Sequence, residues 1–248
     1  MNAERMEVIG PVLVAAALVA IWQCAYWMIG DIALRSPGQT VRFAAELLAR
    51  PSFWPHLRET ATAFAAALAI AALLGLAIGL ILGLGKLAGD VFEPMLIALY
   101  SIPKVTLYPI LLLSFGLGLS AKIAFGALHG FIPIALFTMN AARNIRPIFL
   151  KTGRVMRLSR WEAVRKLVFP AALPEIFTGF RVGFSLTMIG TVLGEMFASQ
   201  RGLGYLLMNA IGLHNVDIIM SITLMLVVFA AVVSIALLAV DRRLHKRF

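Results

Sequence analysis

Long apolar stretches, four of them uncharged and two with only one or two charged residues, alternate with charged segments along this chain. All six stretches are long enough to cross a bilayer, since about 20 apolar residues in a helix span its hydrocarbon core. They cover approximately residues 8–30, 60–85, 94–120, 123–142, 176–200 and 218–240. They do not alternate between polar and apolar residues, as the strands of a membrane β-barrel do. The pattern therefore predicts an all-α membrane protein, with residues 1–248 forming a single transmembrane domain.

The composition supports a membrane protein and explains the charge. Hydrophobic residues make up 61% of the chain and charged residues only 14%, which is too apolar for an ordinary soluble domain. The net charge of +10 gathers mainly in residues 143–174 and 241–248, so we attribute it to membrane orientation and anionic lipid, not to nucleic acid. The lone Cys24 can form no internal disulfide. The run 8–30 is longer than the apolar part of a signal peptide, and we expect it to remain in the bilayer.

The distribution of Lys and Arg predicts the orientation. If both termini are cytoplasmic, the inner segments hold fourteen of the 22 Lys and Arg residues and the outer segments hold six. Positively charged loops stay on the cytoplasmic side of a membrane. We therefore expect a multi-pass protein with both termini in the cytoplasm.

The segment 143–174 is both basic and patterned. It contains eight of the 22 Lys and Arg residues. Ser159 and Glu162 have the spacing of a capping box, in which the Ser159 hydroxyl accepts from the Glu162 amide while the carboxylate reaches back. Apolar residues then follow at helical intervals, and Pro170 and Pro174 are expected to end the helix. A short capped helix with one apolar stripe is typical of a docking element. The alternative is a basic loop that only sets the topology.

Two predicted spans carry polar residues at membrane depth. The third contains Pro103, Lys104 and Pro109, and broken backbone in a membrane is tolerated only where it is buried in protein or lines a water-filled cavity. Ionisable residues there are functional candidates, although Lys104 near a surface would simply extend its ammonium to water. The fifth contains Arg181, which we interpret as reaching the inner surface in the same way, and Glu195 near the outer end. Glu195 either pairs with a cation across a subunit interface, meets solute, or is a plain interfacial carboxylate. The candidates for a translocation path are Tyr100, Pro103, Lys104 and Glu195.

Two further segments predict helix packing. Gly75, Gly79 and Gly83 recur at four-residue spacing in the second span, so another helix backbone is expected to approach closely there. In the outer segment 31–59, apolar residues at helical spacing over 40–50 predict a helix on the outer membrane face. That helix either contacts an external partner or only covers the interface.

Enzymatic chemistry finds little support in the sequence. The four His residues are scattered, and His214 with Asp217 is weak evidence for a metal site, so we expect no metal. We find no nucleophile elbow and no paired acid–base carboxylates. An intramembrane enzyme and a membrane scaffold remain the alternatives. A scaffold is disfavoured because it has no need of two prolines and a lysine inside a span.

Several motifs occur in the order typical of one transporter family. The strongest is Leu158-Ser159-Arg160-Trp161, followed by FPAALP at 169–174 and by TGFR at 178–181. Weaker matches are Ser36-Pro37, Ile102-Pro103 with Pro109, FGLG at 115–118, Glu195 with GLGY at 202–205, and the basic tail. Over nearly its full length the chain resembles permease subunits of bacterial ATP-binding-cassette (ABC) importers, in the branch that carries sulfonates, taurine and nitrate. The resemblance implies a type I importer permease core of six transmembrane helices, with a cytoplasmic coupling helix between the fourth and fifth spans.

The sequence departs from the family at the start of its signature loop. The family usually has Glu-Ala-Ala here, followed after three residues by Gly, and these positions are Lys151-Thr152-Gly153 and Arg157. Either the partner ATPase has compensating acidic residues, or coupling is altered. The resemblance assigns ATPase coupling to Lys151, Thr152, Gly153, Arg157, Leu158, Ser159, Arg160 and Trp161.

The resemblance also implies the partners. A second copy of the permease would form a homodimer, two cytoplasmic subunits would bind ATP-Mg and hold the central loops, and a periplasmic binding protein would deliver the solute. This chain would then sit in the bacterial inner membrane, contact lipid, carry no cofactor and hydrolyse nothing itself. Lys104 and the positive net charge favour a small anionic solute.

Overall fold

The computed structural model describes residues 3–145, 148, 151, 155–197 and 199–247. Helices account for nearly all of this part of the chain, and it contains no strand. In chain order the helices are α1 (Ala3–Ile29), α2 (Pro37–Ala49), α3 (Trp54–Leu84), α4 (Lys86–Ser101), α5 (Tyr108–Phe115), α6 (Leu119–Arg143), α8 (Arg160–Ala163), α9 (Phe169–Phe197), α10 (Leu203–Gly212) and α11 (Val216–Arg247). Short 3-10 turns cover Pro51–Phe53 and Lys104–Leu107, and a π-helical turn covers Val164–Val168. The predicted all-α fold is confirmed in the described residues.

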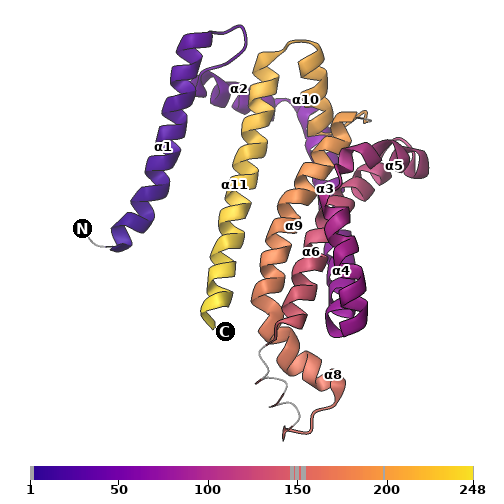
Figure 1. Ribbon diagram of the computed structural model, residues 1–248. Helices are drawn as coiled ribbons and strands as arrows, with labels where there is room; N and C mark the ends of the chain where they lie inside the picture. The colour runs from indigo at the N-terminus through magenta and orange to yellow at the C-terminus, as the bar shows by residue number, and fades with distance from the viewer. Residues whose placement is uncertain (1–2, 146–147, 149–150, 152–154, 198, 248) are drawn as a thin grey trace.

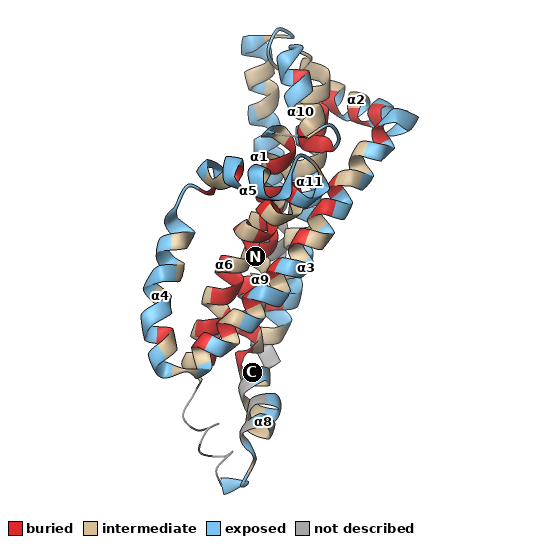
Figure 2. Ribbon diagram, turned by 90° about the vertical axis from the view of Figure 1, so that its right-hand side faces the viewer, coloured by how far each residue is buried: buried red, intermediate tan, exposed pale blue. Residues whose placement is uncertain are grey.

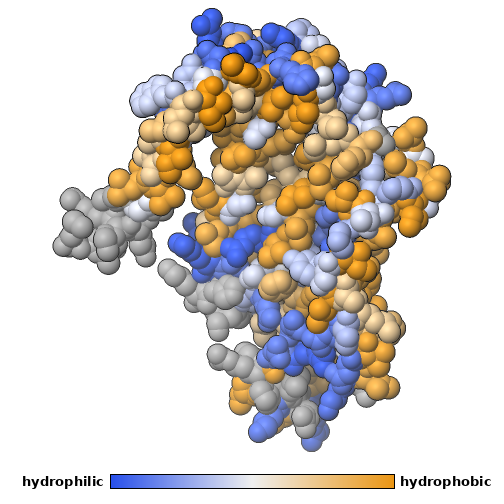
Figure 3. Space-filling model, turned by 45° about the horizontal axis from the view of Figure 1, so that its top comes forward, coloured by the Kyte–Doolittle hydropathy of each residue, from blue (hydrophilic) through white to orange (hydrophobic). Residues whose placement is uncertain are grey.

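Among the described residues, five helices are long and apolar enough to cross a membrane by themselves: α1, α3, α6, α9 and α11. The pair formed by α4 and residues 104–115 passes the same test but bends by 90° at its break. The bundle thus has up to six spans. Figure 3 shows broad hydrophobic areas across the surface, with hydrophilic side chains gathered toward its upper and lower ends. This is the distribution that a lipid environment requires.

The core of the bundle is formed by α3, α6 and α9, which lie side by side in Figures 1 and 2. Ala63, Ala67 and Ala71 on α3 are fully buried. The predicted glycine groove is confirmed on the same face. A Cβ at Gly75 would lie 2.7 Å from Ile134 Cβ, and one at Gly83 would lie 2.6 Å from Ala142 Cβ. Small residues let the backbones of α3 and α6 approach closely, which is the main source of helix association in lipid.

The outer helices pack much less. In Figure 1, α1 stands apart from the bundle and joins it only through α2. α2 begins at Ser36 with a capping box, in which Ser36 Oγ accepts from Gln39 N at 3.2 Å and Gln39 Oε1 accepts from Ser36 N at 2.8 Å. The predicted helix over 40–50 is therefore confirmed, and Ser36-Pro37-Gly38 is its start. Arg35 Nε is paired with Asp217 at the beginning of α11, which joins α2 to the opposite end of the chain.

The third predicted span, 94–120, differs from the observed structure. Instead of one interrupted helix, α4 ends at Ser101, a short 3-10 turn follows, and α5 turns away. Pro103 lies at the break, where it has no N–H to continue the ladder. Gly116 and Gly118 have φ values of 74° and 150°, which favour glycine, and they separate α5 from α6. Lys122, which the sequence placed in an outer loop, lies inside α6 and is 1% exposed.

The prediction that Pro170 and Pro174 end the docking helix is wrong. Both residues lie inside α9, whose first residue is Phe169. The π-helical turn at Val164–Val168 precedes Pro170, and its altered hydrogen-bond register accommodates a proline near the start of α9. Pro174 is buried against the bundle, where neighbouring helices stabilise a broken turn. Consequently α8 continues into α9 without a flexible linker.

The contact between α3 and α6 predicts a steep cost at Gly79. A Cβ at this position would lie 2.5 Å from Thr138 Cβ and 2.6 Å from Ala135 O. We expect Gly79→Ala to lower stability by about 1–3 kcal/mol, because overpacking must push two backbones apart. The measurement is thermal unfolding of the purified protein in detergent. Gly38→Ala is the matched control, since nothing lies within 4 Å of a Cβ there. Equal stability of the two variants would contradict the close packing.

Candidate functional site

The capped helix of the basic segment is confirmed. Ser159 Oγ accepts from Glu162 N at 3.3 Å, and Glu162 Oε2 accepts from Ser159 N at 3.1 Å. Lys166 pairs with Glu162 at 3.0 Å. This ion pair and the bonds from Ser159 lower the pKa of Glu162 to about 2. The carboxylate is therefore ionised at neutral pH, and the cap is lost only in strong acid.

The predicted docking residues surround an exposed apolar surface. Trp161 is 73% exposed, and Val155 and Met156, which precede it by six and five residues, are also exposed. Arg157 adopts a left-handed conformation with φ of 50°, which turns the chain ahead of the cap. Leu158 is half-buried and Lys151 is exposed, Arg160 begins α8, and Thr152 and Gly153 lie outside the described residues. We call Val155, Met156 and Trp161 the docking patch; the first two lie within the segment 151–161 that was expected to dock, although they were not named individually. Exposed apolar patches within a polar rim mark interaction sites.

Ion pairs flank the basic segment on both sides. Before it, Arg143 at the end of α6 binds Asp90 and, at 2.7 Å, Glu93 on α4. After it, Arg181 on α9 lies 3.6 Å from Asp241 on α11. Arg181, which we interpreted as reaching the inner surface, therefore also has a carboxylate partner on α11. These pairs join the basic segment to α4 and to α11.

The break between α4 and α5 brings three predicted path residues together. Lys104 is 8% exposed, its Nζ donates to Tyr100 O at 2.9 Å, and it lies 5.0 Å from the centroid of the Tyr100 ring. Pro103 directly precedes it. Tyr108 then anchors α5 to the bundle, since its hydroxyl donates to Gly194 O on α9 at 2.5 Å. The Tyr108 hydrogen bond therefore fixes the break in place, and the Lys104 ammonium group folds back onto the end of α4.

Glu195, the fourth predicted path residue, has a different set of partners. It is 0% exposed, and its carboxylate accepts from Thr60 Oγ1 at 2.8 Å and from Gly204 N at 3.0 Å. Thr60 Oγ1 in turn accepts from Leu203 N at 2.8 Å. Leu203 is the first residue of α10. Glu195 therefore fastens α9 to α3 and to the start of α10.

The backbone next to Glu195 is held by side chains at four successive residues. Arg201 O accepts from Lys122 Nζ at 2.8 Å, and Gly202 N donates to His56 Nδ1 at 3.2 Å. Leu203 N donates to Thr60 Oγ1, and Gly204 N donates to the Glu195 carboxylate. Gly202 has φ of 123° and lies directly against the Glu195 carboxylate, so no larger residue fits there. We call residues 201–204 the fastened turn.

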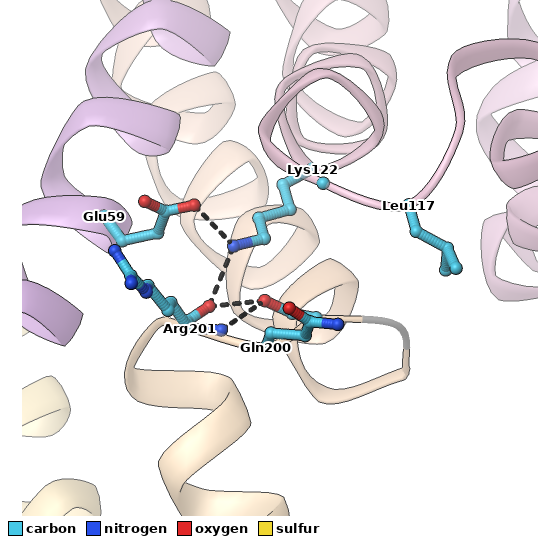
Figure 4. Close-up of a pocket in the computed structure, with 7 residues that line it drawn as sticks. Glu59, Leu117, Lys122, Gln200 and Arg201 are labelled. Atoms are coloured by element: carbon cyan, nitrogen blue, oxygen red, sulfur yellow. Dashed lines mark hydrogen bonds and ion pairs between the residues drawn. The ribbon is translucent and has the colours of Figure 1, made fainter.

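A polar pocket opens beside the fastened turn. Figure 4 shows Lys122 between Glu59 and the carbonyl of Arg201, with Gln200 and Leu117 along the same pocket. Lys122 Nζ lies 3.0 Å from Glu59 Oε1. The pocket has a volume of about 540 Å³, and its lining residues are Glu59, Leu117, Gly118, Lys122, Ser199, Gln200 and Arg201. No local sequence pattern indicates this pocket, because Lys122 is 63 residues from Glu59 and 79 residues from Arg201 along the chain.

The described residues contain no group of three His, Cys, Asp or Glu side chains that could hold a metal ion. Asp217, weighed with His214 as a weak metal pair, is bound to Arg35. The geometry thus combines a transmembrane bundle, an exposed docking patch at one end and a polar pocket at the other. Such an arrangement suits movement of a solute across a membrane under the control of a partner.

Comparison with known proteins decides the family. Residues 71–248 match the family described as binding-protein-dependent transport system inner membrane component. The chain belongs to this family. It is an importer permease, with the type I ABC importer fold, and the family's role is transport and not catalysis.

Relatives match this permease over most of their length. A probable ABC transporter permease protein of Haemophilus influenzae is 30% identical over 229 residues, which cover 90% of this chain and 91% of the relative. The taurine transport system permease protein of Escherichia coli K12 is 26% identical over 92% of this chain and 86% of its own. The nitrate import permease protein of Synechocystis is 27% identical over 89% of this chain and 82% of its own.

Solved structures support the fold. The permease resembles a chain of the inward-facing MetNI methionine ABC transporter with a TM-score of 0.68 and 20% identity, over 80% of this chain and 96% of that one. It also resembles a chain of an amino acid ABC transporter crystallised with histidines, with a TM-score of 0.58 and 18% identity, over 83% of this chain and 98% of that one. These likenesses agree with the helical bundle.

The fastened turn predicts different outcomes for two substitutions of Glu195. Glu195→Ala leaves the Gly204 amide without its buried acceptor, which costs about 1–3 kcal/mol, while the Thr60 hydroxyl can still donate to His56 O at 3.2 Å. Glu195→Gln keeps an acceptor oxygen and should lose much less. Thermal unfolding in detergent, together with labelling of Ser199→Cys to detect opening of the turn, measures both effects. If the alanine variant is as stable and as closed as the glutamine variant, the turn is not held by this carboxylate.

Proposed function

We propose that this permease imports a small anionic solute of the sulfonate, taurine or nitrate class from the periplasm into the cytoplasm. The names of the relatives support this class, since they include taurine, aliphatic sulfonate and nitrate permeases. Lys104 lies at the break, and Lys122 and Arg201 line the polar pocket. These cationic groups favour an anionic solute. The chain lies in the bacterial inner membrane among lipids, with both termini cytoplasmic, and binds no nucleic acid.

The docking patch is the single observation that carries the coupling part of the proposal. Val155, Met156 and Trp161 are exposed at the end of the bundle opposite α2 and α10 (Figure 1). This end carries the basic segment, which membrane orientation places in the cytoplasm. A cytoplasmic ATPase subunit that binds ATP-Mg covers the patch. The residues that dock it are Lys151, Thr152, Gly153, Arg157, Leu158, Ser159, Arg160 and Trp161.

Movement passes from the docking patch along α9. α8 runs through the π-helical turn into α9 with no linker, so a displacement of the patch moves the helix as a unit. At the same time Arg143 transmits the displacement to α4 through Asp90 and Glu93. α4 and α9 therefore respond together when ATP binding closes the two ATPase subunits. This chain hydrolyses nothing itself and needs no cofactor of its own.

The path lies between two copies of the chain. An apolar groove of about 610 Å³ opens between α3, α5 and α6, with Ile70, Leu74 and Phe131 among its lining residues. Ile110 and Leu113 on α5, close in sequence to the lining residue Leu111, are also exposed. A second permease copy covers these faces, and the break with Tyr100, Pro103 and Lys104 then borders the path. A periplasmic binding protein delivers the solute to the outer end.

The docking role predicts a clear loss of partner. In Trp161→Asp a carboxylate replaces the largest apolar side chain of the docking patch, so the ATPase should dissociate while the permease stays inserted. Co-purification of the ATPase with the detergent-solubilised permease measures the effect. Trp161→Phe is the matched control and should retain the ATPase, because it keeps an apolar ring. Full retention of the ATPase by the aspartate variant would overturn the docking role.

A further inference from the structure

We propose that the polar pocket beside the fastened turn is an anion-binding site, which takes the charged group of a small organic anion such as an alkanesulfonate. The inference rests on the proposed function only for the direction of transport. The binding itself follows from the charge, the rigidity and the shape of the pocket.

The charges of the pocket leave one cation uncompensated. Lys122 is buried and lies 3.0 Å from the Glu59 carboxylate, so these two charges neutralise each other. Arg201 is exposed, and its guanidinium has no ion-pair partner among the residues that the structure describes. The lining therefore carries a net charge of about one positive unit, which attracts anions.

Hydrogen bonds hold the backbone that carries this cation in a fixed place. Arg201 O is bound by Lys122, and the next three residues are bound by His56, Thr60 and Glu195. Arg201 N also donates to Ser199 Oγ at 3.1 Å, which closes the turn in front of it. A ligand thus meets a turn that is already ordered, and binding does not have to order it. The planar guanidinium offers paired N–H donors that match the oxygens of a carboxylate or sulfonate.

The shape of the pocket favours an organic anion over a bare inorganic one. Its volume of about 540 Å³ lies in the range of small-molecule sites. In Figure 4 the Arg201 side chain extends beside Glu59 on one side of the pocket, Leu117, which is 82% exposed, lies on the other side, and Gln200 lies between them. A sulfonate group can meet the guanidinium while the attached carbon chain extends toward Gln200 and Leu117. A ligand with both a charged and an apolar part uses both sides.

Cysteine labelling tests the site without knowledge of the natural solute. The full transporter is prepared with Cys24→Ala and Leu117→Cys, so that the introduced thiol reports on the pocket. Its reaction rate is compared for two methanethiosulfonate reagents, one with an ethylsulfonate group and one with an ethyltrimethylammonium group. Leu213→Cys, exposed in the loop between α10 and α11, is the reference site. We expect the sulfonate reagent to be favoured at Leu117→Cys and not at Leu213→Cys.

Two substitutions should change this preference in opposite directions. Arg201→Ala should lower the ratio of sulfonate to ammonium rates about tenfold at low salt, because one unit charge at about 6 Å in water changes each rate about threefold. Glu59→Gln should raise the ratio by a similar factor, since it releases the charge of Lys122 and keeps an acceptor for it. Arg58→Ala is the matched control, because Arg58 is exposed nearby on α3 but does not line the pocket.

Competition with a free anion distinguishes binding in the pocket from an effect of local charge on the labelling rate. Ethanesulfonate in the millimolar range should slow labelling of Leu117→Cys, leave Leu213→Cys unchanged, and lose its effect in Arg201→Ala. Equal reagent rates at both sites, no response to Arg201→Ala and Glu59→Gln, or no protection by ethanesulfonate would overturn the anion site. Labelling requires neither ATP nor a binding protein, so a transporter that fails to import anions but shows this protection would contradict the proposed function and leave the site intact.

Discussion

The hydrogen bonds of the buried Glu195 carboxylate are the interactions on which the half of the bundle that carries α10 depends. In a bilayer, a polar group away from water must find its partners within the protein. Glu195 finds them in Thr60 and in the Gly204 amide, and so it joins α9, α3 and α10 at one point. Gly202 is required for the same reason, because only glycine fits against the carboxylate with its positive φ. The arrangement fixes the turn that lines the polar pocket.

Helix α9 also connects this part of the molecule to the docking patch. α9 is continuous with the capped α8 through a π-helical turn, and Tyr108 and Glu195 hold its outer part. Close packing through Gly79 and its neighbours keeps α3 and α6 alongside it. The permease is therefore built around a continuous helix with the docking patch at one end and the fastened turn at the other. In the proposed mechanism, a displacement of the patch reaches the pocket through this helix.

Much of this architecture could be predicted from local patterns. The spans follow from apolar runs, the Ser159–Glu162 cap from its spacing, and the α3–α6 contact from the glycine repeat. The break near Pro103 was visible as a proline pair with Lys104, but its bend of 90° was not. The roles of Lys122, Arg143 and Glu195 could not be predicted, because each has at least one partner that is 50 or more residues away along the chain. Pro170 and Pro174 misled the reasoning, since a π-helical turn and burial overrode their tendency to end a helix.

The stiffness of α9 can be measured directly by the distance between spin labels at Arg165→Cys and Met208→Cys in a Cys24→Ala background, with one labelled chain per transporter. Both positions are exposed, one beside the docking patch and one on α10. If α9 moves as a unit, this distance stays the same, within less than a helical turn of about 5 Å, between the nucleotide-free and the ATP-trapped states. A change larger than one turn would show that the connection bends, and would contradict the central claim.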